Sequence, residues 1–159
     1  MNIVIKKAGL EQLSHIVSIE NASFSVPWSE NSLKTEMEDE NSHFTVAQVD
    51  GVTAGFLILH TFADEGEIYN VAVKQQLRGN GIGDALLTEA LKYAAGSRIL
   101  KVFLEVRESN TPARKLYEKH GFKNLSIRKG YYDKPIEDCI NMEWSAEKKQ
   151  PKAYFGGLE

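Results

Sequence analysis

Three glycines within five residues form the segment of the chain with the clearest chemical potential. Gly79, Gly81 and Gly83 stand in a run that begins at Arg78 and ends at Asp84, between an apolar stretch and a segment with helical spacing. Glycines lack the Cβ atom that would keep a ligand away from the backbone, and the free N–H groups at a helix N-terminus attract anions. The run therefore predicts a loop that binds a phosphate group.

Two familiar phosphate loops do not fit this run. A Walker loop needs Gly-Lys-Ser/Thr at the start of the helix, whereas Asp84 follows the last glycine here. A dinucleotide fingerprint needs a small residue three positions after its second glycine, and Asp84 or Leu86 occupies that position, depending on the pair counted. The simpler alternative is a glycine turn that only joins a strand to a helix.

The composition sets the class of protein. With 159 residues, 42% of them hydrophobic and 26% charged, the chain is expected to fold as one globular domain. A net charge of −3 gives no basic surface, so we expect no direct nucleic-acid partner. Cys139 is the only cysteine, and the four histidines lack metal-ligand spacing, which predicts neither a disulfide nor a metal site.

The sequence also gives no sign of a membrane. No apolar run approaches the ~18 residues that a membrane span needs, and the N-terminus lacks the apolar core of a signal peptide. We therefore expect a cytoplasmic protein without a membrane partner, either a monomer or a weak dimer.

The hydrophobic pattern divides the chain into strands and helices. Apolar or alternating runs predict strands, and apolar residues spaced by three and four predict amphipathic helices. The order predicts an α/β (α+β) fold, with a mixed, mostly antiparallel sheet of about seven strands flanked by about four helices. We expect one domain over residues 1–144 and a polar, mobile tail over 145–159. Strands are expected at 2–6, 44–49, 53–62, 68–73, 99–106, 122–128 and 138–144, and helices at 10–23, 30–39, 84–96 and 112–121.

Turn and cap residues set several boundaries. The dipeptide at 50–51, Asp-Gly, is a signal for a two-residue hairpin between two of the strands. Gly96 is expected to end the helix that follows the glycine loop, and Thr111 to cap the last helix, ahead of a proline at its first position. The last two strands are expected to turn at residues 130–132.

The run at 99–106 is almost continuously apolar, which predicts a strand covered on both faces. Glu105 interrupts it near its C-terminal end. An acid at the end of an otherwise apolar strand is typical of a cleft. The alternative is an ion pair at the end of the strand, for instance with Arg107 or Lys101.

The pattern Arg-x-x-Gly-x-Gly, formed by Arg78, Gly81 and Gly83 after an apolar strand, resembles the pyrophosphate loop of the GNAT superfamily of acetyl-CoA-dependent N-acetyltransferases. The second half of the chain is similar to the group of this superfamily that acetylates the N-terminal alanine of a bacterial small-subunit ribosomal protein. The resemblance spans about residues 24–142. The matching segments are 27–30, 69–73, 104–110, 116–122 and 128–132.

The resemblance implies a GNAT fold and acetyl-CoA as co-substrate, without a metal. The backbone of Val71, Ala72 and Val73 would pair with the pantetheine arm as an added strand does. Asn110 matches a position that contacts the cofactor, although it could simply satisfy backbone groups where a helix starts. The pyrophosphate would be held by main-chain N–H groups of the loop formed by Arg78, Gly79, Asn80, Gly81, Ile82, Gly83 and Asp84.

One loop residue departs from this scheme in charge. The side chain of Asp84 would repel a diphosphate, so we expect only its backbone to contribute.

The resemblance also assigns the catalytic groups. Glu105 matches the base that takes a proton from the attacking amine, directly or through water, and Glu67, at the entry of the central strand, is the rival. A modest base is sufficient for an α-amine, whose reference pKa is about 8 against about 10.4 for lysine. Tyr117, protonated at neutral pH, could give its proton to the leaving sulfur. The alternative for Tyr117 is core packing.

These observations predict direct acetyl transfer to the N-terminal peptide of a ribosomal protein. A GNAT enzyme acting on small amines or lysine side chains is one alternative, and a CoA-binding module without turnover is another. The segment that connects the first two helices supplies two aromatic residues, and the region of the last turn supplies two more. They would either wall a peptide groove or lie on the surface of the core, and they are Phe24, Trp28, Tyr131 and Tyr132.

Overall fold

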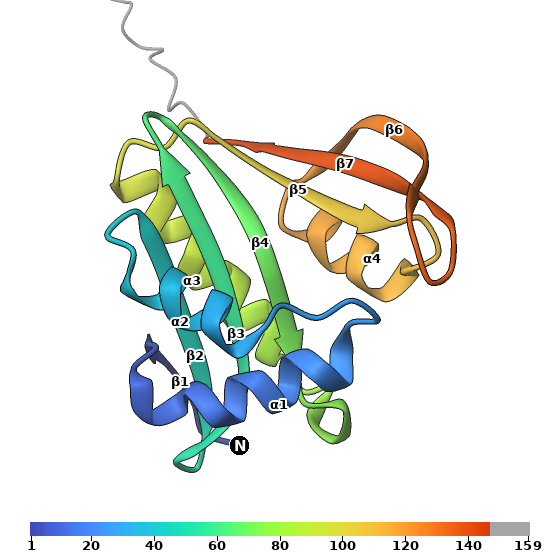
Figure 1. The fold of residues 1–159 in the computed structure, drawn as a ribbon. Helices are drawn as coiled ribbons and strands as arrows, with labels where there is room; N and C mark the ends of the chain where they lie inside the picture. The colour runs from blue at the N-terminus through green and yellow to red at the C-terminus, as the bar shows by residue number, and fades with distance from the viewer. Residues whose placement is uncertain (147–159) are drawn as a thin grey trace, which may run out of the picture.

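The computed structural model describes residues 1–146, and within this range seven strands form one sheet in the order β1-β2-β3-β4-β5-β7-β6 (Figure 1). Only the β4–β5 pair is parallel among the pairs of described strands. The prediction of a mixed, mostly antiparallel sheet is confirmed. The strands are β1 Ile3–Lys7, β2 Ser42–Val49, β3 Val52–Phe62, β4 Glu65–Val73, β5 Lys101–Arg107, β6 Lys123–Tyr132 and β7 Glu137–Ser145.

Four α-helices within the described range cover the two faces of the sheet (Figure 1). The helices α3 and α4 pack on one face, with Leu86 and Tyr117 in a common core. On the other face α1 and α2 pack over β2, β3 and β4, with Ile16 and Leu33 in a second core. No helix of the described part is long and apolar enough to cross a membrane. The helices are α1 Leu13–Ser23, α2 Glu30–Glu38, α3 Ile82–Gly96 and α4 Thr111–Lys119, with short 3-10 turns at Leu10–Gln12 and Gln75–Leu77.

The sheet opens between its two parallel strands. Only residues 65–68 of β4 pair with residues 101–104 of β5, after which the strands diverge (Figure 1). Beyond Ile68, the edge of β4 that faces β5 has no strand partner among residues 1–146. Backbone N–H and C=O groups require partners, so this edge is available to an extended ligand.

A β-bulge at Tyr69 changes the direction of the side chains in β4. Ile58 lies opposite Asn70 and Leu59 lies opposite Ile68, which leaves Tyr69 as an extra residue. The alternation reverses there, because Ile68 belongs to the α3 core while Ala72 belongs to the α1–α2 core. As a result Glu67 and Asn70 lie on the same face of the sheet.

The strand predicted to be covered on both faces is covered on one. In β5, Val102, Leu104 and Val106 are buried, whereas Lys101 and Glu105 are exposed. That prediction was wrong because α1 and α2 pack over β2 to β4, so the same face of β5 borders a cleft.

The hairpin signal at residues 50–51 is confirmed, since Asp50 and Gly51 have φ angles of 51° and 83° between β2 and β3. The last turn was misplaced. β6 continues through Tyr132, and the chain turns at residues 133–136, after an irregularity in the β6–β7 register. Ser145, assigned to the tail, instead ends β7, and residues 147–159 of the expected tail lie outside the described range.

Two helix ends also differ from the prediction. The N-cap of α4 is Asn110, whose side-chain oxygen accepts the Ala113 N–H at 3.2 Å, rather than Thr111. The C-cap of α3 is Ser97, and the left-handed residue beyond it is Arg98, at φ 64°, rather than Gly96. In both cases the cap lies one residue from the predicted one, and the helix itself is confirmed.

Gly55 in β3 must remain small for β4 to lie where it does. A Cβ atom at this position would be 2.8 Å from the backbone oxygen of Ala72. We expect Gly55→Ala to lower the free energy of unfolding by about 1–3 kcal/mol, measured by urea denaturation. Gly96→Ala is the control, because a Cβ there meets nothing within 4 Å. An equal loss in both variants would contradict this account.

Candidate active site

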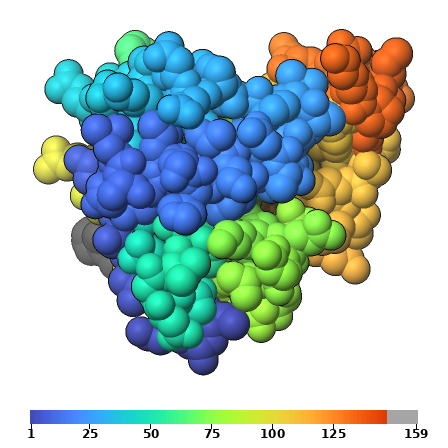
Figure 2. Space-filling view, turned by 60° about the horizontal axis from the view of Figure 1, so that its bottom comes forward, coloured from blue at the N-terminus to red at the C-terminus, as the bar shows by residue number. Residues whose placement is uncertain are grey.

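Two hollows meet where β4 and β5 diverge. One, here called the amine cleft, lies between the segment after α1, the strands β4 and β5, and the β6–β7 turn. The other, the cofactor cleft, lies between the end of β4, the glycine loop and α4. Figure 2 shows the end of the molecule at which α1 (blue), the glycine loop (green) and α4 (orange) surround this region. Both clefts are lined by Ser23, Phe24, Val71, Asn110, Ala113 and Tyr117.

The glycine loop is built to approach an anion. Gly79 and Gly81 have left-handed φ angles of 82° and 84°, and a Cβ atom on either would meet nothing within 4 Å. The first intrahelical bond of α3 runs from the Ala85 N–H to the Gly81 oxygen at 3.0 Å. The N–H groups of residues 82–84 therefore have no intrahelical acceptor, and they lie at the positive end of the helix dipole. This geometry fits a phosphate group.

The polar side chains of the loop divide into two kinds. Arg78 donates from Nε to the Val73 oxygen at 3.1 Å, lines the cofactor cleft and is exposed. Asn80 donates from Nδ2 to the Leu77 oxygen at 3.0 Å and is not among the residues that line the cleft. Arg78 is thus placed to meet an anion, whereas the side chain of Asn80 stabilises the loop itself.

The side chain of Asp84 has partners on α4. Its Oδ1 is 2.9 Å from His120 Nε2 and 3.0 Å from Lys119 Nζ. The hydrogen bonds from His120 and Lys119 lower the pKa of the Asp84 carboxyl. The Lys119 ammonium offsets its negative charge and His120 hydrogen-bonds it, so an acid is tolerated at the start of a helix whose free N–H groups suit an anion.

The remaining predicted cofactor contacts line the same cleft. Val71, Ala72 and Val73 form the free end of β4 across from α4. Gly83 approaches α4 so closely that a Cβ there would be 3.1 Å from a methyl group of Leu116. Asn110 lines both clefts while its side-chain oxygen caps α4, so the alternative role as a helix-start residue is confirmed and its contact with a cofactor stays a prediction.

Tyr117 lies at the junction of the two clefts. Its ring packs against Phe122, with 5.8 Å between the ring centroids, and the residue is only 6% exposed. Burial raises the pKa of its hydroxyl above the ordinary value for tyrosine, so the side chain holds its proton at neutral pH. Tyr117 is therefore packed in the core and also lines both clefts.

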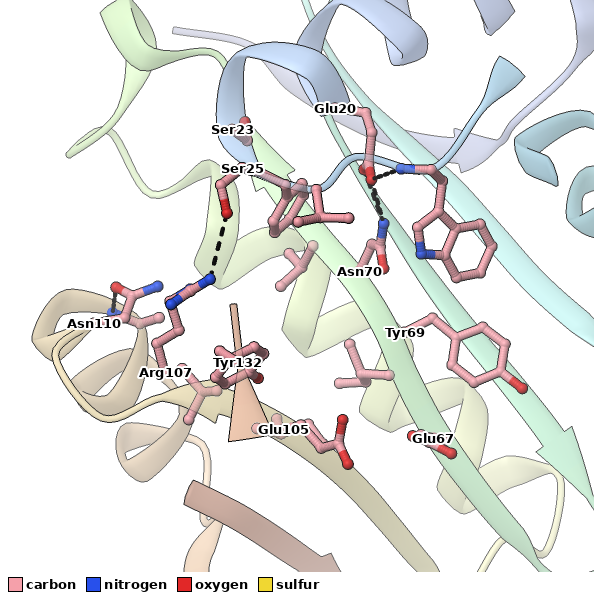
Figure 3. Close-up of a pocket in the computed structure, with 18 of the residues that line it drawn as sticks. Glu20, Ser23, Ser25, Glu67, Tyr69, Asn70, Glu105, Arg107, Asn110 and Tyr132 are labelled. Atoms are coloured by element: carbon pink, nitrogen blue, oxygen red, sulfur yellow. Dashed lines mark hydrogen bonds between the residues drawn. The ribbon is translucent and has the colours of Figure 1, made fainter. Parts of the chain in front are cut away.

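Two carboxylates, Glu67 and Glu105, line the amine cleft on neighbouring strands (Figure 3). The alternative of an ion pair for Glu105 is confirmed, but its partner is neither Arg107 nor Lys101. Its Oε2 lies 3.5 Å from Nη1 of Arg128 on β6. Burial raises the pKa of the Glu67 carboxyl, the charge of Glu105 raises it further, and His60 opposes the rise. Such a shift suits a group that must accept a proton near neutral pH.

The ion pairs formed by the two basic residues of β5 explain why Glu105 turns to β6. Arg107 is paired with Glu137 at 3.2 Å, and Lys101 with Glu143 at 3.1 Å. Both cations are therefore occupied by acids of β7, the strand next to β5.

A third carboxylate in the amine cleft was not singled out from the sequence. Glu20 of α1 is 1% exposed, and its oxygens accept the Trp28 N–H at 2.9 Å and Asn70 Nδ2 at 2.8 Å. Burial raises the pKa of the Glu20 carboxyl, and these two hydrogen bonds oppose the rise. The sequence does indicate that Glu20 is buried. Its helical spacing from Leu13 and Ile16 puts an acid on the apolar stripe of the helix.

Arg107 joins the two loops on either side of the amine cleft. Its guanidinium donates to the oxygens of Asp133 at 2.6 Å and Pro135 at 2.9 Å, and to Ser25 Oγ at 3.3 Å (Figure 3). It also lies 4.5 Å from the centre of the Tyr132 ring. The segment after α1 and the β6–β7 turn are therefore held in fixed relation to β5.

Three of the four aromatic residues predicted to wall a groove do so. Phe24, Trp28 and Tyr132 line the amine cleft, and Trp28 lies against Tyr69 with 5.7 Å between the ring centroids. Tyr131 does not line the cleft, and its ring lies beside the guanidinium of Arg128.

Comparison with known proteins identifies the family to which this fold and these clefts belong. Residues 13–122 match the model of the acetyltransferase (GNAT) family. The chain belongs to the GNAT family. It is 36% identical over 120 residues to a Haemophilus influenzae protein named [ribosomal protein bS18]-alanine N-acetyltransferase, covering 76% of this chain and 81% of that one. A Bacillus subtilis protein that carries the same name provisionally is 34% identical over 139 residues, 87% of this chain and 92% of its own.

A solved structure agrees with this assignment. The crystal structure of the ribosomal-protein-S18-alanine N-acetyltransferase from Escherichia coli superposes with a TM-score of 0.87 at 29% identity, covering 97% of this chain and all of that one. The protein is thus a GNAT acetyltransferase, as the sequence predicted, and this family uses acetyl-CoA.

Tyr117→Phe should separate chemistry from packing in this GNAT enzyme. The phenyl ring keeps its contact with Phe122, while the proton donor is lost. We expect turnover to fall by about 100-fold or more with the affinity for acetyl-CoA unchanged, measured by thiol release and calorimetry. Tyr93→Phe, at a tyrosine that stacks on His43 away from the junction, is the control. Unchanged turnover in Tyr117→Phe would refute the acid role.

Glu105→Gln tests which carboxylate takes the proton. If Glu105 is the base, turnover falls by about 100-fold or more at every pH, and this is the result we expect. The charge of Glu105 raises the pKa of Glu67, so its removal lowers that pKa. Retained turnover, with the acidic limb of the pH–rate profile moved to lower pH, would assign the role to Glu67.

Proposed function

We propose that this GNAT enzyme transfers acetyl from acetyl-CoA to the N-terminal α-amine of a ribosomal protein that begins with alanine. One observation carries the proposal: the cleft beside the glycine loop and the cleft lined by Glu67 and Glu105 meet at Tyr117. A cofactor and an amine entering from opposite sides would meet at this point. The names of the relatives from Haemophilus influenzae and Escherichia coli supply the substrate class.

The cofactor cleft fits acetyl-CoA along its length. The N–H groups of residues 82–84 and the exposed Arg78 would hold the pyrophosphate. The free backbone edge of residues 71–73 would hold the pantetheine arm, as a neighbouring strand does. Asn110, at the start of α4, would contact the cofactor at the junction. Acetyl-CoA supplies the acetyl group as a thioester.

Glu105 in the amine cleft and Tyr117 at the junction perform the two proton transfers. The neutral amine attacks the acetyl carbon, and Glu105 takes the proton that the nitrogen loses as the new bond forms and then releases it to solvent. Tyr117 gives its proton to the sulfur as the carbon–sulfur bond breaks, so the products are an amide and a free thiol. The buried Tyr117 hydroxyl regains a proton from solvent before the next cycle. No covalent enzyme intermediate is required.

An α-amine suits this site better than a lysine side chain. Its reference pKa is near 8, against about 10.4 for lysine, so a larger share of it is already the neutral, nucleophilic amine near neutral pH and a modest base is sufficient. Glu67 and Glu105 also give the cleft a negative charge that attracts a protonated peptide terminus. A ribosomal substrate would place the enzyme in the cytoplasm.

The proposal is tested with two peptides and acetyl-CoA. One peptide begins with a free alanine and has its lysines blocked, and the other has a blocked α-amine and a free lysine. We expect thiol release and a mass increase of one acetyl group with the first peptide alone. Acetylation of the lysine peptide, or of polyamines in preference to both peptides, would overturn the substrate assignment.

A further inference from the structure

Glu20 connects three elements that face the amine cleft. Its carboxylate, on α1, accepts the backbone N–H of Trp28 in the α1–α2 segment and the side-chain amide of Asn70 in β4 (Figure 3). The three residues line the amine cleft together, and they are here called the Glu20 clamp.

A carboxylate buried at this position is energetically costly. Glu20 is 1% exposed, and no cation is among the residues that hydrogen-bond it within the described range. Removing a charge from water is costly even when it is hydrogen-bonded, and an apolar side chain of similar volume would fill the same space at lower cost. Packing alone therefore does not account for the acid.

The two partners of Glu20 lie at the parts of the cleft that a peptide would contact. Trp28 lies against Tyr69, the residue of the β-bulge, with 5.7 Å between the ring centroids. Asn70 lies between that bulge and Val71, where the free edge of β4 borders both clefts. The side of the amine cleft formed by Phe24 and Trp28 of the α1–α2 segment is here called the aromatic wall. Through these contacts Glu20 fixes the position of the aromatic wall relative to β4.

The opposite end of the same wall is held separately. Ser25 accepts a hydrogen bond from Arg107, which ties the start of the α1–α2 segment to β5. Without the Glu20 clamp, the end of this segment at Trp28 would keep only apolar contacts, with Tyr69 and with the α1–α2 core, and its connection to α2. The clamp is therefore the polar contact that fixes the wall at β4.

We propose that Glu20 is a positioning residue for the peptide substrate, which acts through Trp28 and Asn70 to hold the wall of the amine cleft against β4. It does not exchange protons with the substrate. This role rests on the proposed function for its substrate, but the geometry of the clamp can be tested without any peptide.

The substitution Glu20→Gln removes the negative charge and one of the two acceptor oxygens of the clamp, so its hydrogen bonds to Trp28 and Asn70 are weakened. We expect the KM for the alanine peptide to rise about tenfold, in line with the loss of a hydrogen bond to a charged group. The kcat at saturating peptide and the KM for acetyl-CoA should stay within about twofold, because the junction at Tyr117 is untouched.

The double variant Glu20→Gln/Asn70→Asp exchanges donor and acceptor. The new amide at position 20 can accept the Trp28 N–H and donate to the new carboxylate at position 70, so the KM for the peptide should return toward the wild-type value. Asn70→Asp alone brings two carboxylates together and should impair peptide binding. Glu143→Gln is the control, since it removes a carboxylate paired with Lys101 outside both clefts.

The fluorescence of Trp28 reports on its environment in the Glu20 clamp without a substrate. The chain has two tryptophans, so a Trp144→Phe background leaves Trp28 as the only emitter. We expect a red shift of its emission in Glu20→Gln, as the wall separates from β4, and recovery in the double variant. If the wild-type enzyme does not acetylate alanine peptides, the proposed function fails. The emission of Trp28 would still show whether Glu20 holds the aromatic wall in place.

Two results would overturn the proposal. One is a Glu20→Gln variant whose peptide KM and Trp28 emission match those of the wild type. The other is a variant with a lower melting temperature, a lower kcat and unchanged KM values, which the double variant does not rescue. That second pattern is the one expected of a residue that only stabilises the fold.

Discussion

The proposed active site depends on how little β4 and β5 pair. Their hydrogen bonds involve only residues 65–68 and 101–104, and the strands then separate although both continue. A sheet that closed completely would satisfy the edge of β4 internally and would leave no room between the two halves of the molecule. Among the described strands, the separation leaves the edge of β4 unpaired and supplies space for two clefts, with Glu67 and Glu105 in one of them and Tyr117 at the junction of the two.

Other features hold this opening in shape. The bulge at Tyr69 reverses the alternation of β4, so Glu67 and Asn70 face the amine cleft together. The Asp84 pair with His120 and Lys119 ties the glycine loop's helix to α4 on the cofactor side. Arg107 and Glu20 hold the peptide side through separate hydrogen bonds. The site is thus a gap in a sheet whose borders are fixed by polar contacts.

Local sequence patterns predicted most of the architecture and the position of the glycine loop. Hydrophobic periodicity, turn residues and glycine content all depend on residues that are close together in the sequence. Contacts across the sheet were harder to predict. The partner of Glu105 proved to be Arg128 on another strand, and no local signal marks a bulge at Tyr69. Glu20 was within reach of sequence reasoning, because it interrupts an apolar stripe, but its partners come from β4 and a loop. Such partners depend on tertiary packing.

The most direct test of the central claim is a crystal structure with a conjugate in which CoA is joined through an acetyl bridge to the α-amine of an alanine peptide. We predict the pyrophosphate on the N–H groups of residues 82–84, the pantetheine arm along residues 71–73, and the peptide in the amine cleft beside Glu105. The bridge should lie next to the Tyr117 hydroxyl. A conjugate bound with its peptide outside the amine cleft, or with its bridge away from Tyr117, would contradict the account.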